Sequence, residues 1–164
     1  MSKTSCTIRS ATVADVPLIL RFIRDLAEYE RLAHEVVADE DDLRRTLFGE
    51  RPAAEVLLAE TADGPVGFAL FFTNYSTFQG RPGLYLEDLY ISEDMRGNGI
   101  GEALLRRLAA LAVERGYGRF EWAVLDWNES AHRFYHALGA HSMDEWTVWR
   151  VDGEALLKLA EEER

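Results

Sequence analysis

A glycine-rich segment in the middle of the chain restricts the possible fold most strongly. Gly97, Gly99 and Gly101 lie within five residues, after one apolar run and before a long amphipathic one. Without a Cβ, the backbone can adopt conformations that side chains forbid, so several N–H groups can point at one anion. The start of the following helix adds free donors and the positive end of its dipole. The segment predicts a strand, a phosphate-binding loop and a helix in this order, with Arg96 as a supplementary donor.

Two common phosphate-binding loops do not match this segment. A P-loop ends in Gly-Lys-Ser/Thr, whereas Gly101 is followed by Glu102 and Ala103. A dinucleotide-binding fingerprint has the spacing Gly-x-Gly-x-x-Gly in an early β-α-β unit, whereas this spacing is Gly-x-Gly-x-Gly in mid-chain. On the glycines alone, a turn without a ligand stays an alternative.

The hydrophobic periodicity of the whole chain predicts an α/β fold. Strands are expected at 7–9, 55–61, 66–74, 84–91, 120–125 and 145–151, and helices at 14–31, 40–48, 99–115, 130–138 and 154–163. A turn is expected at 62–65 and a loop at 75–83. This order joins an antiparallel meander to a late β-α-β crossover. It predicts a mixed, mostly antiparallel central sheet with helices on both faces, in one domain over residues 1–164.

Charge and composition exclude several classes of partner. The formal net charge is −11, which disfavours nucleic acid and anionic membranes as partners. No apolar stretch approaches the ~18 residues of a membrane span, and the single cysteine, Cys6, cannot form an internal disulfide. We therefore expect a cytoplasmic protein without nucleic-acid or membrane partners. The negative charge either favours a cationic substrate such as an amine or only aids solubility.

The glycine segment and four others resemble one known family. The pattern Arg-x-x-Gly-x-Gly, between a strand and a helix, resembles the pyrophosphate loop of the GNAT superfamily of N-acetyltransferases. Residues 84–91 (LYLEDLYI) and 127–135 (WNESAHRFY) are similar to its diamine (spermidine/spermine) acetyltransferase branch, as are residues 8–12 and 26–30. The resemblance implies the GNAT fold, acetyl-CoA as acetyl donor and a small-molecule primary amine as acceptor.

The resemblance also implies a homodimer, because enzymes of this branch form dimers with acceptor sites near the interface. The sequence adds weak support of its own. Trp146 and Trp149 lie on the expected late strand and look exposed, although they are also compatible with an ordinary core.

The implied acetyl-CoA site draws on three segments. In this family two neighbouring strands separate beside the glycine loop, and the pantetheine arm pairs with strand backbone in the gap. The residues implied are Leu89, Tyr90 and Ile91 on the strand, Arg96, Gly97, Asn98, Gly99, Ile100 and Gly101 in the loop, and Asn128, Ser130 and Phe134 at the late helix. Asn128 also stands where a side chain would cap that helix, which is an alternative role.

Three side chains are candidates for the chemistry itself. Glu87 and Asp88 are adjacent in an apolar strand, so they are expected on opposite faces of the sheet. The resemblance selects Glu87 as a base that acts through ordered water, and leaves Asp88 a structural or substrate-facing role. It also selects Tyr135 to donate a proton to the leaving thiolate. The alternatives are a solvent-facing acid and a core tyrosine.

The acceptor amine is less well defined. The resemblance implies Tyr29, Glu30, Tyr75 and Phe78 around it, together with Glu87 and Asp88. Residues 74–80 (NYSTFQG) lack an acidic residue of the polyamine acetyltransferases and are more similar to thialysine-type enzymes. A diamine, a polyamine and a lysine-like amino acid therefore all stay open.

Two other functions are compatible with the same fold. One is acetylation of protein lysines or N-termini, which needs an open peptide groove. The other is a non-catalytic acyl-CoA-binding regulatory domain, although Glu87 and Tyr135 are both present. His132 and His136 have a helical spacing that can bind zinc, but Arg133 replaces the glutamate of the zinc-protease motif, and no metal is expected.

Overall fold

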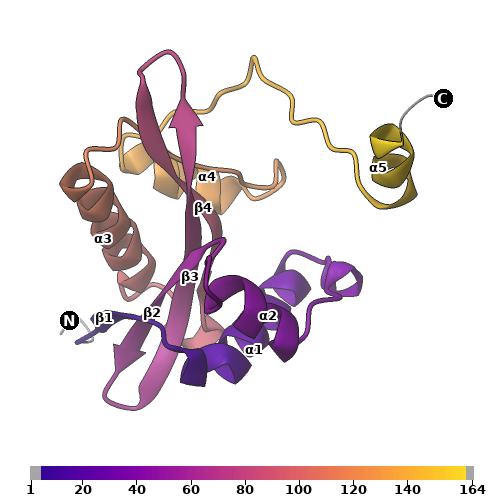
Figure 1. Ribbon diagram of the computed structural model, residues 1–164. Coiled ribbons are helices and arrows are strands. Elements are labelled where there is room, and N and C mark those ends of the chain that lie inside the picture. Colours follow the sequence, from indigo (N-terminus) through magenta and orange to yellow (C-terminus); the bar gives the residue numbers. More distant parts are fainter. Residues whose placement is uncertain (1–4, 162–164) are drawn as a thin grey trace. The chain divides into compact units, whose positions relative to one another are not determined.

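The computed structural model describes residues 5–161, which divide into two compact units, one ending at Leu125 and the other starting at Asp126 (Figure 1). The first unit contains β1 (Thr7–Ser10), α1 (Val16–Tyr29), α2 (Glu40–Leu47), β2 (Glu55–Thr61), β3 (Gly64–Ser76), β4 (Arg81–Ile91), α3 (Ile100–Glu114) and β5 (Phe120–Trp122). The second contains α4 (Glu129–Ala137) and α5 (Gly153–Ala160). That residues 1–164 form one domain stays a prediction.

The five strands form one mixed sheet in the order β1-β2-β3-β4-β5. β1, β2, β3 and β4 pair antiparallel with one another, whereas β5 is parallel to β4 because α3 carries the chain back along the sheet. This arrangement confirms the predicted α/β fold, with its mostly antiparallel sheet and late β-α-β crossover.

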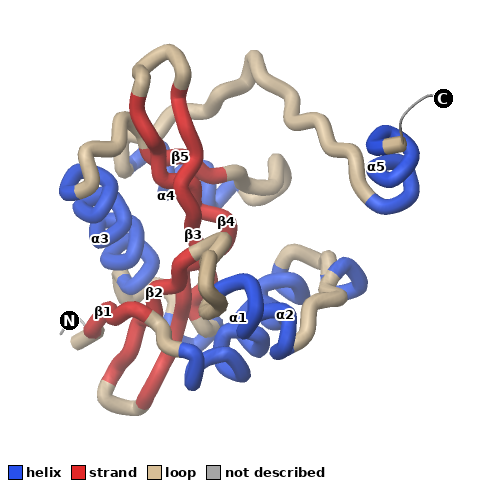
Figure 2. The backbone as a smooth tube through the Cα atoms, viewed as in Figure 1, coloured by secondary structure: helices blue, strands red, loops and turns tan. Residues whose placement is uncertain are grey.

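Helices cover both faces of this sheet (Figure 2). On one face α1 and α2 pack over alternate strand residues, and the Phe22 ring stacks on Phe68 with 5.7 Å between centroids. On the other face lies α3, whose Leu104 and Leu108 are fully buried. Each such large apolar side chain contributes about 1.5–3 kcal/mol when it leaves water. The sheet is therefore held rigidly where β4 runs between the two layers.

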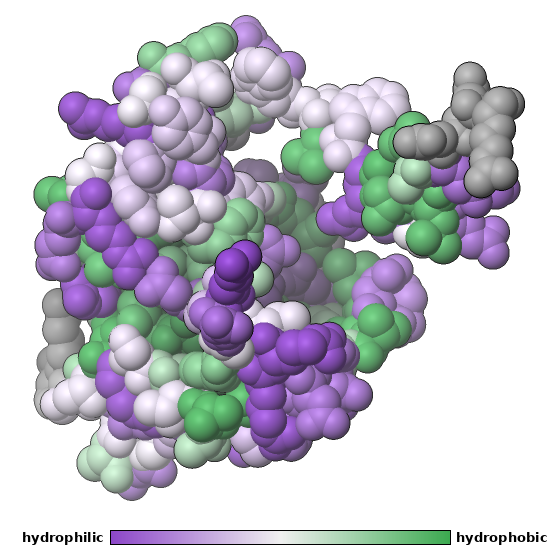
Figure 3. Space-filling view, viewed as in Figure 1, coloured by the Kyte–Doolittle hydropathy of each residue, from purple (hydrophilic) through white to green (hydrophobic). Residues whose placement is uncertain are grey.

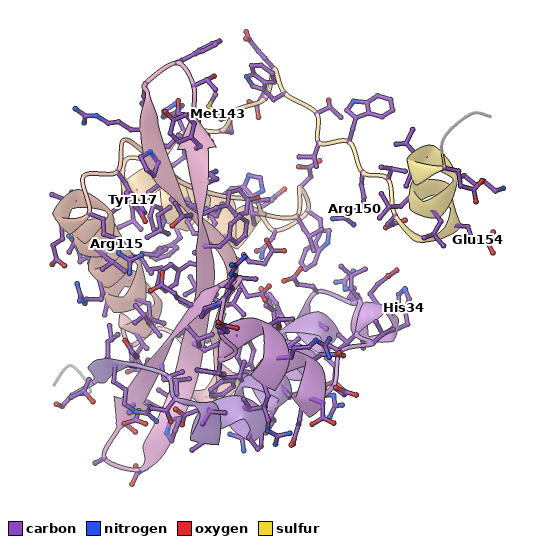
Figure 4. All side chains as sticks on the ribbon, viewed as in Figure 1. His34, Arg115, Tyr117, Met143, Arg150 and Glu154 are labelled. Carbon is purple, nitrogen blue, oxygen red and sulfur yellow. The ribbon has the colours of Figure 1, made fainter. Side chains whose placement is uncertain are left out.

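The far end of α3 is tied to the sheet by charge. Arg115 forms a bidentate ion pair with Glu55 of β2, with N–O distances of 2.8 Å. Its guanidinium also lies 5.9 Å from the centre of the Tyr117 ring, and Figure 4 shows these two side chains next to each other. Gly116 ends the helix with a φ of 72°, as its position in the sequence predicts.

Several boundaries in the first unit differ from the sequence-based prediction, and the strand expected at 120–125, for example, ends at Trp122. The expected loop at 75–83 is a hairpin turn of only four residues, 77–80, because β3 and β4 pair as far as Ser76 and Arg81. A 3-10 turn, Val13–Asp15, precedes α1, so the helix is shorter than the predicted 14–31. The expected capping interaction is present at the start of this 3-10 turn, since the Asp15 carboxylate accepts from the Thr12 backbone N–H at 2.8 Å.

The predicted strand at 145–151 is wrong, because this segment has no regular secondary structure. Apolar alternation permits a strand, but a strand also needs a neighbour that pairs with its backbone. The described part of the second unit contains no other strand. The last helix ends at Ala160 rather than 163, and residues 162 and 163 of that prediction lie outside the described residues.

The second unit exposes many apolar side chains. Figure 3 shows hydrophobic residues on the surface of α5, where Leu157 and Leu159 are 67% and 72% exposed. Trp146 and Trp149 in the preceding segment are 74% and 91% exposed. Across the described residues, no helix combines the length and the apolar character that crossing a bilayer requires.

Candidate active site

A β-bulge in the centre of β4 lies at the adjacent acids Glu87 and Asp88. Leu86 pairs with Phe71 and Asp88 pairs with Leu70, which leaves Glu87 as an extra residue without a partner across the ladder. Bulges of this kind redirect side chains and are frequent next to active sites. Because of the extra residue, Asp88 lies on the same face as Leu70 and Tyr90, toward α1. The regular alternation of side chains along β4 is therefore interrupted between Leu86 and Asp88.

The bulge brings three carboxyl groups into electrostatic contact. Burial, followed by the charges of Glu87 and Glu30, raises the pKa of Asp88 to about 7. Burial also raises the pKa of Glu30, which lies at the end of α1. Glu87 itself is exposed at the surface of the sheet. A carboxyl that titrates near neutral pH can take up a proton and release it again, which suits acid–base chemistry.

The backbone of β4 is open along one edge beyond the bulge. β5 pairs with β4 only from Leu84 to Leu86, whereas β3 pairs with β4 as far as Ile91. The Ser92 N–H donates to the Val66 carbonyl of β3, so by alternation the backbone groups of Leu89 and Ile91 point away from β3. Two strands that separate in this way leave room for an extended ligand to pair with β4.

The glycine loop follows this open edge and has the backbone that the sequence predicts. Gly97 and Gly99 have φ angles of 80° and 79°, in the left-handed region that side chains rarely adopt. Ile100 is buried and anchors the start of α3, whose first N–H groups have no partner within the helix. The Asn98 amide donates to the Met95 carbonyl at 3.0 Å and closes the loop. These free donors at a positive helix end suit a pyrophosphate.

Gly101 differs from the other two glycines. It lies inside α3, where a Cβ would meet only Ile91 Cγ1, at an ordinary contact distance of 3.8 Å. The folded chain therefore has room for a side chain at this position. Free space at this position suits an anionic group bound at the helix start.

Arg96 points toward α1. Its Nε donates to the Ile91 carbonyl at 3.0 Å, and its guanidinium lies 4.5 Å from the centre of the Tyr29 ring and 5.6 Å from that of Tyr90. Asp25, Glu28 and Glu93 complete a shallow pocket around it. Sequence reasoning missed this contact between the loop and the end of α1, since nothing local to either segment signals it.

Not all predicted acceptor residues come together. Tyr29 and Glu30 lie at the end of α1 on the face of Asp88, whereas Tyr75 and Phe78 lie at the tip of the β3-β4 hairpin. Tyr75 pairs with Pro82, five residues from Glu87, which is about 16 Å along a strand. Phe78 is 99% exposed. Within the first unit these two aromatics therefore do not share a site with the acids.

The remaining predicted residues belong to the second unit. Asn128 caps α4, because its Oδ1 accepts from the Ala131 N–H at 3.3 Å and from the Ser130 hydroxyl at 3.2 Å. The alternative role of Asn128 as a helix cap is thus confirmed. Tyr135 is half-buried on the same helix, with its ring 5.5 Å from that of Phe134.

A sheet that opens beside a glycine loop and a helix start, with acids on the same strand β4, is the arrangement expected of an N-acetyltransferase. The chain matches the model of the acetyltransferase (GNAT) family over residues 21–140, and it belongs to this family.

Curated relatives resemble the chain over nearly its whole length. It is 42% identical to the thialysine N-epsilon-acetyltransferase of Bos taurus, an alignment that covers 93% of this chain and 96% of the relative. It is 36% identical to the L-ornithine N5-acetyltransferase NATA1 of Arabidopsis thaliana, over 91% and 85% of the two chains. An integron cassette protein from the mobile metagenome of V. cholerae has a similar structure, with a TM-score of 0.80, 29% identity and coverage of 96% and 99%.

Proposed function

We propose that this protein transfers an acetyl group from acetyl-CoA to the side-chain amine of a small, lysine-like molecule. The observation that carries the proposal is the group of Glu30, Glu87 and Asp88 at the β4 bulge, beside the open edge of the strand. Carboxylates attract a cationic amine and can accept its proton. The relatives named for thialysine and L-ornithine favour an amino acid, while a diamine or polyamine remains a second acceptor class.

The roles of the first unit follow from its geometry. Gly97, Asn98, Gly99, Ile100 and Gly101 would hold the pyrophosphate, with Arg96 beside them. The backbone of Leu89 and the N–H of Ile91 would pair with the pantetheine arm, since the Ile91 carbonyl already accepts from Arg96. When bound, acetyl-CoA supplies the acetyl group as a thioester. A free N–H on the open edge would stabilise negative charge on the thioester oxygen.

Proton transfer is assigned to Glu87, assisted by Asp88. A primary amine with a pKa near ~10 arrives protonated at neutral pH, and its nitrogen attacks only after the proton has left. We propose that the Glu87 carboxylate accepts this proton. Asp88 and Glu30 would hold the cation, with Tyr29 at its side. Tyr75 and Phe78 lie at the hairpin tip, away from these acids, so their proposed role as acceptor contacts rests on the resemblance alone.

The second unit would contribute the proton donor. Tyr135 is proposed to protonate the leaving sulfur, and Asn128, Ser130 and Phe134 to contact acetyl-CoA. These four roles rest on the family resemblance. We also propose a homodimer on the same resemblance, and the exposed Trp146 and Trp149 add an argument of their own. The proposed cytoplasmic location rests instead on the sequence, which has a single cysteine and no apolar stretch of membrane-spanning length.

A panel of acceptors tests the proposal directly. The purified protein is mixed with acetyl-CoA and with lysine, thialysine, ornithine, 1,3-diaminopropane, spermidine or a lysine-containing peptide, and thiol release is measured. We expect the highest kcat/KM with one of the amino acids. Turnover of the peptide alone would favour a protein acetyltransferase, and acetyl-CoA binding without any turnover would favour a regulatory domain.

A further inference from the structure

Arg96 is held by contacts that a phosphate donor does not need. Its Nε–H donates to the Ile91 carbonyl at 3.0 Å, which fixes one edge of the guanidinium on the end of β4. The guanidinium then lies over Tyr29 at 4.5 Å and beside Tyr90 at 5.6 Å. A cation at these distances from aromatic rings is attracted by their electron-rich faces. The first residue of the glycine loop is therefore attached to the last residue of α1.

This attachment continues into the core. The Tyr90 ring lies 5.8 Å from that of Phe22, which is 1% exposed and stacks on Phe68. Tyr90 is thus held by its contact with the core residue Phe22, whereas Tyr29 is 42% exposed. Acidic side chains on both sides, among them Asp25, Glu28 and Glu93, favour a permanent cation at this position. Arg96 is the basic residue of the pocket.

The end of α1 also needs support from outside the helix. Arg31, just beyond it, has a φ of 63°, a left-handed conformation that is costly for a residue with a Cβ. That conformation lets the Arg31 N–H donate to the Glu28 carbonyl and the Leu32 N–H to the Ala27 carbonyl, at 3.0 and 2.8 Å. A helix end closed at this cost keeps its geometry only if its surroundings hold it.

We propose that Arg96 is a positioning residue for the acceptor amine, because it docks Tyr29 and thereby fixes the turn of α1 that carries Glu30. The contact between Arg96 and Tyr29 then connects the loop that receives the pyrophosphate to the helix end that receives the amine. This inference rests on the proposed function, and it assigns Arg96 a role on the acceptor side in addition to its place in the loop.

Substitution by lysine separates the two roles. Arg96→Lys keeps the positive charge for a phosphate but loses the planar guanidinium and the Nε–H that reaches Ile91. We expect the KM for the amine to rise about fivefold to tenfold, in line with the loss of a cation–π contact, with kcat nearly unchanged. The Kd of acetyl-CoA, measured by calorimetry, should change less than threefold.

A double-mutant cycle with Tyr29 tests the link itself. Tyr29→Leu removes the ring, so Arg96→Lys should raise the amine KM less than twofold in that background. Arg21→Lys is the matched control, since Arg21 lies 5.5 Å from the Phe22 ring elsewhere on α1 and should leave both constants unchanged. Equal effects of Arg96→Lys in both backgrounds, or an effect on acetyl-CoA binding alone, would overturn the proposal.

Amide hydrogen exchange gives a readout without turnover. Arg96→Lys should speed exchange of the Arg31 and Leu32 amides about fivefold to tenfold, because the helix end opens more often. Arg21→Lys should not. Unchanged protection in Arg96→Lys would refute the docking even if the enzyme is active. If the wild type acetylates no amine but the exchange changes as expected, the docking is supported and the proposed function is what fails.

Discussion

Asp88 is the residue whose properties depend most on its neighbours. Its ordinary pKa is 3.8, and burial with the charges of Glu87 and Glu30 raises it to about 7 in the folded state. Between these values the folded protein binds more protons than the unfolded chain, so the free energy of unfolding falls as pH rises. Ionised Asp88 therefore lowers the free energy of unfolding near and above neutral pH. Such a loss of stability is common for buried titratable groups at functional sites.

Replacement of Asp88 measures this cost. We expect the wild type to lose on the order of 2–3 kcal/mol, relative to Asp88→Asn, between pH 5 and pH 8. Urea unfolding of both proteins at the two pH values gives the difference. Glu50→Gln, at an exposed position in the loop after α2, keeps Asp88 and should therefore lose stability over this pH range as the wild type does. An equal pH dependence of wild type and Asp88→Asn would show that the carboxyl titrates normally.

Glu87 should control the pH dependence of turnover. Glu87→Gln removes the proposed base, and kcat/KM at pH 7 should fall by about 10²-fold or more. The deficit should shrink as pH rises, because the free amine becomes abundant near its own pKa of ~10. A pH–rate profile of both enzymes decides this, and identical profiles would exclude Glu87 from proton transfer.

Tyr135 offers a similar test of the proposed acid. Tyr135→Phe deletes one hydroxyl and keeps the ring beside Phe134, so folding should survive. If the hydroxyl acts only as the sulfur leaves, single-turnover rates at saturating acetyl-CoA should fall about 10²-fold while the Kd of acetyl-CoA stays nearly constant. Equal rates would assign Tyr135 a packing role alone.

At the level of elements, two glycines at the start of α3 allow effects on stability and effects on acetyl-CoA binding to be measured separately. Gly99 has a φ of 79°, whereas Gly101 is an ordinary helical residue with space for a Cβ. We expect Gly99→Ala to lose about 1 kcal/mol of stability together with affinity for acetyl-CoA. Gly101→Ala should fold as well as the wild type, because alanine favours a helix, yet bind acetyl-CoA at least tenfold more weakly.

Calorimetry with acetyl-CoA and thermal unfolding of each variant check both expectations. For the larger change Gly99→Val, the rise in the KM for acetyl-CoA, expressed as a free energy, should exceed the loss in the free energy of unfolding. Normal acetyl-CoA binding by Gly101→Ala would mean that the start of α3 does not approach the pyrophosphate.

At the level of the whole molecule, the segment between α4 and α5 is the feature that most needs an explanation. Trp146, Val148 and Trp149 are 74%, 83% and 91% exposed in a stretch with no regular structure. Exposed apolar side chains in such number mark an interaction surface. A second copy of the chain is the proposed partner.

The dimer can be tested by mass. Light scattering at micromolar concentration should give twice the chain mass of 18.6 kDa. Trp146→Ser combined with Trp149→Ser should shift the mass toward one chain, whereas Leu157→Ser in α5 serves as a control for exposed apolar residues elsewhere. A wild type that scatters as a monomer would contradict the dimer.

The sequence by itself determined the features that depend on neighbours along the chain. Helix periodicity places α1, α2, α3 and α4 within a few residues, and the capping pair Thr12 and Asp15 marks a start. Gly97 and Gly99 predict a left-handed backbone conformation that only glycine adopts easily. Such signals are local, because dihedral preferences and i to i+4 contacts need no distant partner.

Only the tertiary structure decided the features that depend on pairing between distant segments. The bulge at Glu87 exists because β3 and β4 pair in two registers, and it moves Asp88 to the face of α1. Arg96 meets Tyr29 because β4 ends where α1 ends. The same rule explains the failed strand at 145–151, since alternation can offer a strand but only a paired backbone makes one.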